Sequence, residues 1–333
     1  TMLEKEKRDG VVANKIAESL SFADEAIDAI KRVAHLSKAD LTTKMVIEFT
    51  ELQGVIGEIY ALKSGEKEIV ATAIREQYLP KFAGDKLPES SVGSIFSLAD
   101  KIDTIAGLFA IGEIPTGSTD PFALRRSAIG VINIIRNNSW KFNLDEAVEA
   151  SLYEYINDLG LTFNHEEVIA NVRDFFLGRI KTMLQDEGIR YDIIDSVLIP
   201  ESEIHNIFDK AKELNEWFKE DRSKFVDAYN RINNLTKNVD LLEVKEDLLV
   251  EEAEKDLYMK YLEIDGSFKE ALAEEKYMEA MDLLNDLVPS IDKFFDNVMV
   301  MAEDDKVREN RLGLINRIEE NIQKILKIEN IVE

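Results

Sequence analysis

Residues 97–126 read SLADKIDTIAGLFAIGEIPTGSTDPFALRR. The first part is an apolar run without proline, and the turn at 111–121 holds two prolines and two glycines. Asp120 and Pro121 then form a helix start, because aspartate is a favoured N-cap residue and proline is tolerated in the first turn. The stretch predicts a helix, an ordered turn and a second helix.

The same pattern extends along the chain in both directions. Only 15 glycines and six prolines interrupt 333 residues, fewer than average usage gives. Apolar residues recur at steps of three and four in segments 41–60, 204–218 and 312–326. No sustained period-two alternation is present, so strands are at most minor. We predict an all-α fold.

Polar breaks divide the predicted helices into three parts. Asn137-Asn138-Ser139 is the first break after a compact helical block, and Pro200 separates an apolar segment from an acidic one. We expect a helical domain over 1–138, a helical connector over 139–200 and a helical bundle over 201–333, a number of domains that fits the length.

The net charge of −25 constrains the partners of this protein. Such a surface repels phosphate backbones, so any nucleic acid must be held by local basic patches. The absence of cysteine fits a reducing compartment, and no apolar run is long enough to span a membrane. We expect a cytoplasmic protein that binds neither membranes nor DNA.

Motifs of common catalytic centres are absent from the sequence. The three histidines, His35, His165 and His205, are far apart and form no His-Asp or His-x-x-x-His pair for a metal ion. A Gly-x-Ser-x-Gly elbow, a Walker A loop and a Gly-x-Gly-x-x-Gly turn are also missing. We predict that the chain carries no complete catalytic centre.

Three polar blocks are candidates for function. Asp100 and Asp103 share a helix face among apolar residues, where a carboxylate needs a partner or a metal ion, unless it only caps backbone. Arg125 and Arg126 lie in the first turns of a helix, next to like dipole charge, and favour a nearby anion, either a carboxylate or an RNA phosphate. Residues 229–238 (YNRINNLTKN) form a basic, amide-rich face, suited either to RNA bases and phosphates or to ordinary packing.

At these blocks the chain resembles the C-terminal half of the β subunit of bacterial two-subunit glycyl-tRNA synthetases. The matching segments are 36–61 (LSKADLTTKMVIEFTELQGVIGEIYA), 97–126, 228–237 (AYNRINNLTK) and 291–314 (IDKFFDNVMVMAEDDKVRENRLGL). The resemblance implies an HD-type domain over 1–138 and, over 201–333, an anticodon-binding bundle of the DALR type shared with arginyl-tRNA synthetase. It also implies a large N-terminal portion before this chain.

The resemblance further implies a degenerate HD site. The positions equivalent to the metal-binding His-Asp are Ser37-Lys38, and the later aspartate is kept as Asp100. A serine and a lysine ammonium cannot replace an imidazole and a carboxylate on a divalent cation. We therefore expect no metal and no hydrolysis, with Lys38 neutralising Asp100 as a buried pair.

The implied partners are glycine tRNA and the α subunit, which would perform glycine activation and transfer with ATP and Mg²⁺, so that this chain needs no cofactor. Two alternatives remain open, an active HD phosphohydrolase and a helical scaffold that only docks the α subunit. The predicted tRNA-binding residues are Arg231, Asn234, Lys237, Arg308, Asn310 and Arg311 in the bundle, and Lys101, Arg125 and Arg126 in the HD-like domain.

Overall fold

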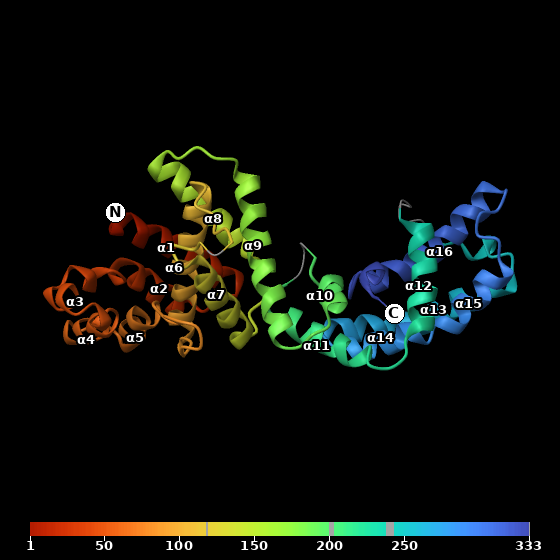
Figure 1. Cartoon of the computed structure of the whole chain (residues 1–333), viewed down its shortest axis with the longest axis horizontal. Coiled ribbons are helices and arrows are strands. Elements are labelled where there is room, and N and C mark those ends of the chain that lie inside the picture. The colour runs from red at the N-terminus through yellow and green to blue at the C-terminus, as the bar shows by residue number, and fades with distance from the viewer. Residues whose placement is uncertain (118, 200–202, 238–242, 333) are drawn as a thin grey trace. The chain divides into compact units, whose positions relative to one another are not determined.

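The computed structural model describes residues 1–117, 119–199, 203–237 and 243–332 (Figure 1). The predicted all-α fold is confirmed, because within these ranges the only β contact is an isolated bridge between Thr116 and Thr119. No described helix is both long and apolar enough to cross a membrane. The chain forms two compact units: unit 1 comprises Thr1–Thr182 and Glu203–His205, and unit 2 comprises the rest of the described chain.

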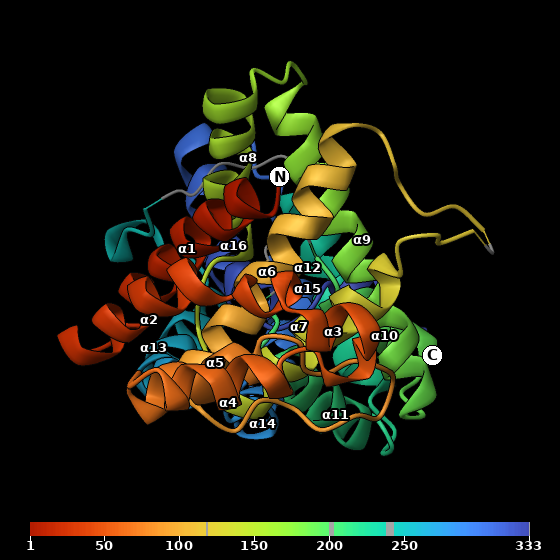
Figure 2. The same ribbon diagram turned by 90° about the vertical axis from the view of Figure 1, so that its left-hand side faces the viewer.

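Unit 1 is built around one long, buried helix, α6 (Ser91–Ala110). It packs against five other helices of this unit. Figure 2 shows α1 (Met2–Ser19) beside α2 (Asp24–Leu36), and α4 (Val55–Lys63) beside α5 (Glu68–Glu76). Its helices are α1 (Met2–Ser19), α2 (Asp24–Leu36), α3 (Lys44–Glu48), α4 (Val55–Lys63), α5 (Glu68–Glu76), α6, α7 (Leu124–Asn138), α8 (Leu144–Leu159) and most of α9 (His165–Asp186), with 3₁₀ turns η1 (Ala39–Thr42) and η2 (Thr50–Leu52).

Helix α6 begins where Ser90 accepts a hydrogen bond from the Gly93 amide at 3.0 Å. The buried Glu76 carboxylate accepts bonds from the amides of Glu89 and Ser90, both at 3.0 Å, and so fixes the preceding turn. Fifteen residues of α6 are buried, so the helix is enclosed on nearly all sides, as a central helix is.

The periodic segment 41–60 is not one helix. The structure breaks it into η1, α3, η2 and α4, because Gly54 takes a φ of +82° and its amide donates to Asp40 Oδ2 at 2.7 Å. The positive φ suits glycine and ends any helix there. Several apolar side chains of this segment consequently face solvent instead of the core.

The helix predicted to start at Asp120-Pro121 begins later, at Leu124. Ala123 adopts a left-handed conformation, with φ of 57°, and forms the N-cap. The Asp120 carboxylate still serves this helix start, because it accepts from the Leu124 amide at 2.8 Å and the Arg125 amide at 3.0 Å. The described parts of the connection between α6 and α7, residues 111–117 and 119–123, extend away from the helices (Figure 2).

Unit 2 packs helix on helix around an aromatic core. The Trp217 and Phe225 rings meet edge to face with centroids 5.0 Å apart, and the Tyr229 ring lies tilted against Phe225 at 4.4 Å. The Tyr229 hydroxyl donates to the Leu284 carbonyl at 2.9 Å. Its helices are α10 (Tyr191–Val197), α11 (Ile207–Trp217), α12 (Ser223–Thr236), α13 (Glu252–Ala273), α14 (Tyr277–Asn285), α15 (Val288–Asn297) and α16 (Asp305–Gln323), with 3₁₀ turns η3 (Glu246–Leu248) and η4 (Ile328–Asn330).

The segment 139–200 is shared between the two units. Helix α8 starts at Leu144 with Asn143 as its N-cap, and it packs against α1 and α6 of unit 1. Helix α10 packs against α11 and η4 of unit 2. The predicted connector therefore contributes to the core of each unit, because its apolar faces need partners on both sides.

Candidate nucleic-acid interface

Three of the predicted tRNA-binding residues share one exposed face at the end of α12, with Lys237 as the C-cap residue of the helix. Arg231, Asn234 and Lys237 follow at steps of three, and all three side chains are exposed, whereas Ile232, Asn233 and Thr236 turn inward. The Arg231 guanidinium lies over the Phe295 ring, 4.4 Å from its centroid, and 3.7 Å from Asp292 Oδ1. Stacking on an aromatic ring orients a guanidinium without removing its charge.

The three candidates on α16 are placed differently. Arg308 is half-buried; it donates to the Ala302 carbonyl at 2.9 Å and pairs with Asp305. Asn310 is buried and exchanges two hydrogen bonds with the backbone of Lys245, at 2.7 and 3.1 Å. Arg311 is buried too, pairs with the buried carboxylate of Glu254 and donates to the Met299 carbonyl at 2.8 Å.

Asn310 and Arg311 therefore hold unit 2 together in this structure. A buried, bonded side chain does not present its polar atoms to an RNA phosphate. Sequence reasoning missed Glu254 as the partner of Arg311. A signal existed, since Glu251 and Glu254 have the spacing of a capping box, which the structure shows at the start of α13.

Lys101 of unit 1 is also internal. Its ammonium donates to Ser97 Oγ at 2.7 Å and to the Leu79 carbonyl at 2.8 Å, and burial lowers the pKa of Lys101 to about 8. The side chain fixes the backbone that leads into the 80–87 loop, so it supports the neighbouring surface and does not form it.

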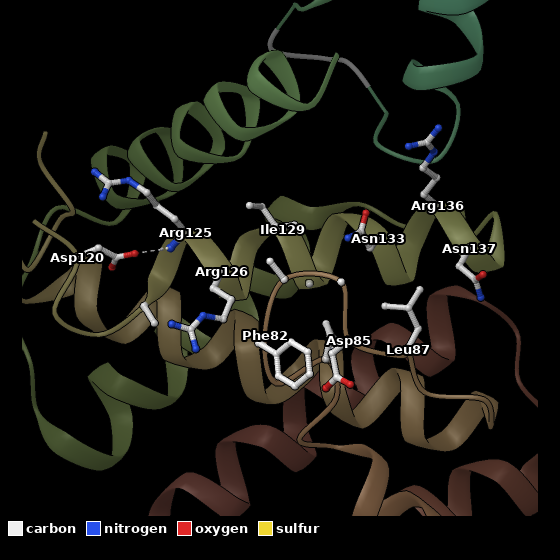
Figure 3. A pocket seen from close by; sticks show the side chains of 15 residues that line it. Phe82, Asp85, Leu87, Asp120, Arg125, Arg126, Ile129, Asn133, Arg136 and Asn137 are labelled. Carbon is white, nitrogen blue, oxygen red and sulfur yellow. Dashed lines mark hydrogen bonds between the residues drawn. The ribbon is translucent and has the colours of Figure 1, made fainter. Parts of the chain in front are cut away.

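Arg125 and Arg126, by contrast, line a groove in unit 1 between α7 and the 80–87 loop (Figure 3). The groove has a volume of about 630 Å³. Arg125 donates to the Gly117 carbonyl at 2.8 Å, while Arg126 points toward the loop that carries Phe82 and donates to the Lys81 carbonyl at 3.3 Å (Figure 3). Asn133, Arg136 and Asn137 continue the lining along α7.

The positions predicted to form a degenerate HD site lie at a buried charge cluster. Lys38 Nζ lies 2.8 Å from Asp100 Oδ1, which confirms the predicted pair, and 2.7 Å from Gln77 Oε1. Ser37 is buried, and its Oγ has no hydrogen-bond partner among the described residues. The adjoining hollow, of about 530 Å³, shares Pro80, Ala123 and Arg126 with the groove.

A second ammonium group, not expected from the sequence, completes this cluster. Lys5 Nζ of α1 lies 3.3 Å from Asp100 Oδ1 and 3.1 Å from both Asp9 Oδ1 and Asp103 Oδ2. Arg8 pairs with Asp103 Oδ1 at 2.9 Å. Asp103, the other carboxylate of the α6 face, is therefore also paired, so its partners are the side chains of Lys5 and Arg8.

The cluster sets the protonation of its members. Burial alone would raise the pKa of Asp100, but the ammonium groups of Lys38 and Lys5 outweigh it, so the pKa of Asp100 falls below its ordinary value. Burial likewise opposes the charge of Lys5, yet its three carboxylate neighbours raise the pKa of Lys5 well above normal. For Asp9 burial dominates and raises its pKa to about 7.

Asp100 is a poor metal ligand in this setting. A divalent cation at Asp100 Oδ1 would lie beside two ammonium nitrogens and meet their repulsion. Within the described ranges, no group of three or more His, Asp and Glu side chains has a geometry that could hold a metal ion.

Comparisons with known proteins agree with the resemblance. The family model described as Glycyl-tRNA synthetase beta subunit matches residues 1–199, and the model of the DALR anticodon binding domain matches residues 202–332. The first match alone covers more than half of the chain. The chain belongs to the glycyl-tRNA synthetase β-subunit family.

Relatives in this β-subunit family match nearly the whole chain. The glycine–tRNA ligase β subunit of Clostridioides difficile (strain 630) is 40% identical over 336 residues, which cover 100% of this chain and 48% of the relative. That of Halalkalibacterium halodurans is 42% identical, covering 94% and 46%, and that of Haemophilus influenzae (strain PittGG) is 40% identical, covering 96% and 46%. The chain spans about half the length of the curated relatives it matches.

Proposed function

We propose that this chain is the tRNA-recognising part of a glycine–tRNA ligase β subunit. Unit 2 would bind the anticodon arm of glycine tRNA, and glycine activation and transfer, with ATP and Mg²⁺, would occur on the α subunit. The supporting observation is that the exposed face Arg231-Asn234-Lys237 lies within residues that match an anticodon-binding domain. The ligase activity, its tRNA and its α partner are thus proposed for the whole protein.

The binding mode follows from the side chains on this face. Arg231 and Lys237 supply positive charge for phosphates, which position the RNA, while the Asn234 amide can bond base edges in a single-stranded loop. Arg308, whose side chain is 31% exposed, can add a contact from α16. The proposal leaves out Lys101, Asn310 and Arg311, because their polar atoms have internal partners.

Arg231→Ala tests this proposal directly. We expect it to weaken binding of a glycine-tRNA transcript about tenfold, in the range for a lost charge-assisted phosphate contact, measured by fluorescence anisotropy and nuclease footprinting. Arg32→Ala is the matched control, because Arg32 is also 46% exposed and ion-paired, but lies on α2 in unit 1. Equal binding by wild type and the Arg231 variant would remove the α12 face from the site.

A scaffold that docks the α subunit is the second candidate. Seven large apolar side chains are exposed on α3, on α4 and at the residue that follows α3, an unusual density for a monomer surface: Met45, Ile47, Phe49, Val55, Ile59, Tyr60 and Leu62. If purified α subunit bound this chain tightly while tRNA did not, the scaffold would replace tRNA recognition as the function.

We further propose that the HD-like unit is not a phosphohydrolase and holds no metal ion. The two ammonium groups at Asp100 support this, since they already neutralise the carboxylate that a metal would need. Metal analysis of the purified chain after incubation with Mn²⁺, together with a nucleotide-hydrolysis assay, tests it. Stoichiometric Mn²⁺ with turnover would restore the phosphohydrolase alternative.

A further inference from the structure

The groove between α7 and the 80–87 loop combines three kinds of side chain on one surface. Along α7, Arg126, Gly130, Asn133 and Asn137 follow at helical spacing, and across from them lies the ring of Phe82, which is 58% exposed (Figure 3). A cation, amides and an exposed aromatic ring match the three parts of a nucleotide: phosphate, base edge and base face.

The carboxylates of this groove do not cancel its positive charge through ion pairs. Asp85 accepts from the amides of Lys81 and Lys86, at 2.8 and 2.9 Å, and Asp120 from those of Leu124 and Arg125. Within the described chain, the guanidinium groups of Arg125 and Arg126 donate only to carbonyl oxygens. Both cations are therefore placed to bind an anion, on a protein whose net charge is −25.

The shape of the groove favours an unpaired strand. Gly130 lets α7 lie close to the start of the loop, since a Cβ there would approach Pro80 Cγ to 3.2 Å and Lys101 Cε to 3.3 Å. The groove volume of about 630 Å³ falls within the ordinary range of small-ligand sites. In a duplex the base faces are stacked and covered, so Phe82 can contact a base face only where the strand is unpaired.

We infer that this groove binds an unpaired nucleotide of RNA, with its base against Phe82 and its phosphate on Arg126. The inference rests on the proposed tRNA recognition but assigns a second RNA contact, on unit 1, with its own chemistry. Asn133 and Asn137 provide amide donors and acceptors for the base edge, and neither side chain has a hydrogen-bond partner among the residues described.

Photo-crosslinking of the whole chain tests the inference. The probes are an unstructured oligoribonucleotide containing 4-thiouridine and a blunt-ended hairpin of the same composition whose 4-thiouridine lies only within the paired stem, with cross-linked peptides mapped by mass spectrometry. We expect the unstructured probe, and not the hairpin, to cross-link to peptides from residues 80–87 and 123–137. Phe82→Leu should abolish this cross-link. It should also weaken binding of the unstructured probe at least fivefold, the lower end for loss of base stacking.

Matched variants separate the site from general effects. Phe122→Leu removes an aromatic ring that is 50% exposed but does not line the groove, and should leave the cross-link unchanged. Arg126→Gln should weaken binding and reduce its salt dependence, whereas Lys86→Gln, on the same loop but outside the lining, should not.

Each other outcome overturns the inference in a recognisable way. If the Phe82 and Phe122 variants lost the cross-link equally, or if only the hairpin were cross-linked, base stacking in the groove would be excluded. Cross-links confined to residues 203–332 would remove the groove and leave the proposed function standing, while failure of any RNA, including glycine tRNA, to bind would remove both. Loss of α-subunit binding, and not of RNA binding, in Phe82→Leu would assign the groove to a protein partner.

Discussion

Lys38 is the residue whose replacement most directly tests the charge cluster. Lys38→Met leaves Asp100 with only Lys5, at 3.3 Å, and leaves Gln77 Oε1 without its donor. We expect a loss of about 3 kcal/mol in unfolding free energy, at the low end for breaking a buried pair, because Lys5 remains. Urea unfolding followed by Trp140 fluorescence in unit 1 measures it.

Lys15→Met is the control for that change. Lys15 pairs with Glu146, but both side chains are nearly half exposed, so removing the pair should cost less than about 1 kcal/mol. A Lys38 variant as stable as the Lys15 variant would show that the cluster does not stabilise unit 1.

Glu319 should make the free energy of unfolding of unit 2 depend on pH. Burial raises the pKa of Glu319 from 4.5 to about 7, so between these values the folded state binds more protons than the unfolded state. The free energy of unfolding should therefore fall as pH rises through this window and level off above it. Glu319→Gln should remove this term and stabilise the protein at pH 8 by up to about 3 kcal/mol, with little effect at pH 4.5.

Unfolding at the two pH values, followed by Trp217 fluorescence, measures the effect of Glu319→Gln. Glu309→Gln, at an exposed site of the same helix, is the control and should shift stability equally at both. An equal gain at both pH values from Glu319→Gln would mean that its proton is not linked to folding.

At the scale of elements, the contact between α6 and α8 depends on a glycine. A Cβ on Gly107 would lie 2.1 Å from Tyr155 Oη, so Gly107→Ala forces the helices apart. We expect a loss of about 1–3 kcal/mol, as for overpacked cores, visible as a lower melting temperature. The double variant Gly107→Ala/Tyr155→Leu should recover part of it.

Gly178→Ala on α9 should change the stability in the opposite direction to Gly107→Ala. Nothing lies within 4 Å of a Cβ there, so alanine should stabilise the helix by about 0.5–1 kcal/mol. Destabilisation by both alanines would indicate a general effect of the substitution, not a specific clash with Tyr155.

The predicted elements differ in how well local pattern determined them. Helices α11 and α16 lie where apolar residues repeat at steps of three and four. Segment 41–60 shows the same repeat but breaks at Gly54, since the bond from its amide to Asp40 comes from tertiary packing. The start of α7 moved to Leu124 for a similar reason: Asp120 bonds the helix amides from outside the helix.

At the scale of the whole molecule, the net charge of −25 constrains the proposed RNA binding. If phosphate contacts come only from a few local cations, affinity should fall steeply with salt, with a slope near the small number of contacts made. We expect glycine-tRNA affinity to drop at least tenfold between about 50 and 200 mM salt. Anisotropy titrations across this range check it, and salt-independent affinity would favour a docking scaffold.

The sequence by itself determined the all-α fold and the family, because helical periodicity and long matching segments are local properties of the chain. The resemblance also predicted the pair of Lys38 and Asp100, which the structure confirms. The sequence also found the exposed α12 face and the two arginines of α7. Only the tertiary structure decided which polar residues are internal. In sequence, Lys101, Asn310 and Arg311 look like surface cations and amides. In the structure all three are buried. Their polar atoms bond to Leu79, Lys245 and Glu254, respectively. The tertiary structure also places Lys5 in the charge cluster and Phe82 at the groove, since both positions depend on contacts with residues far apart in the chain.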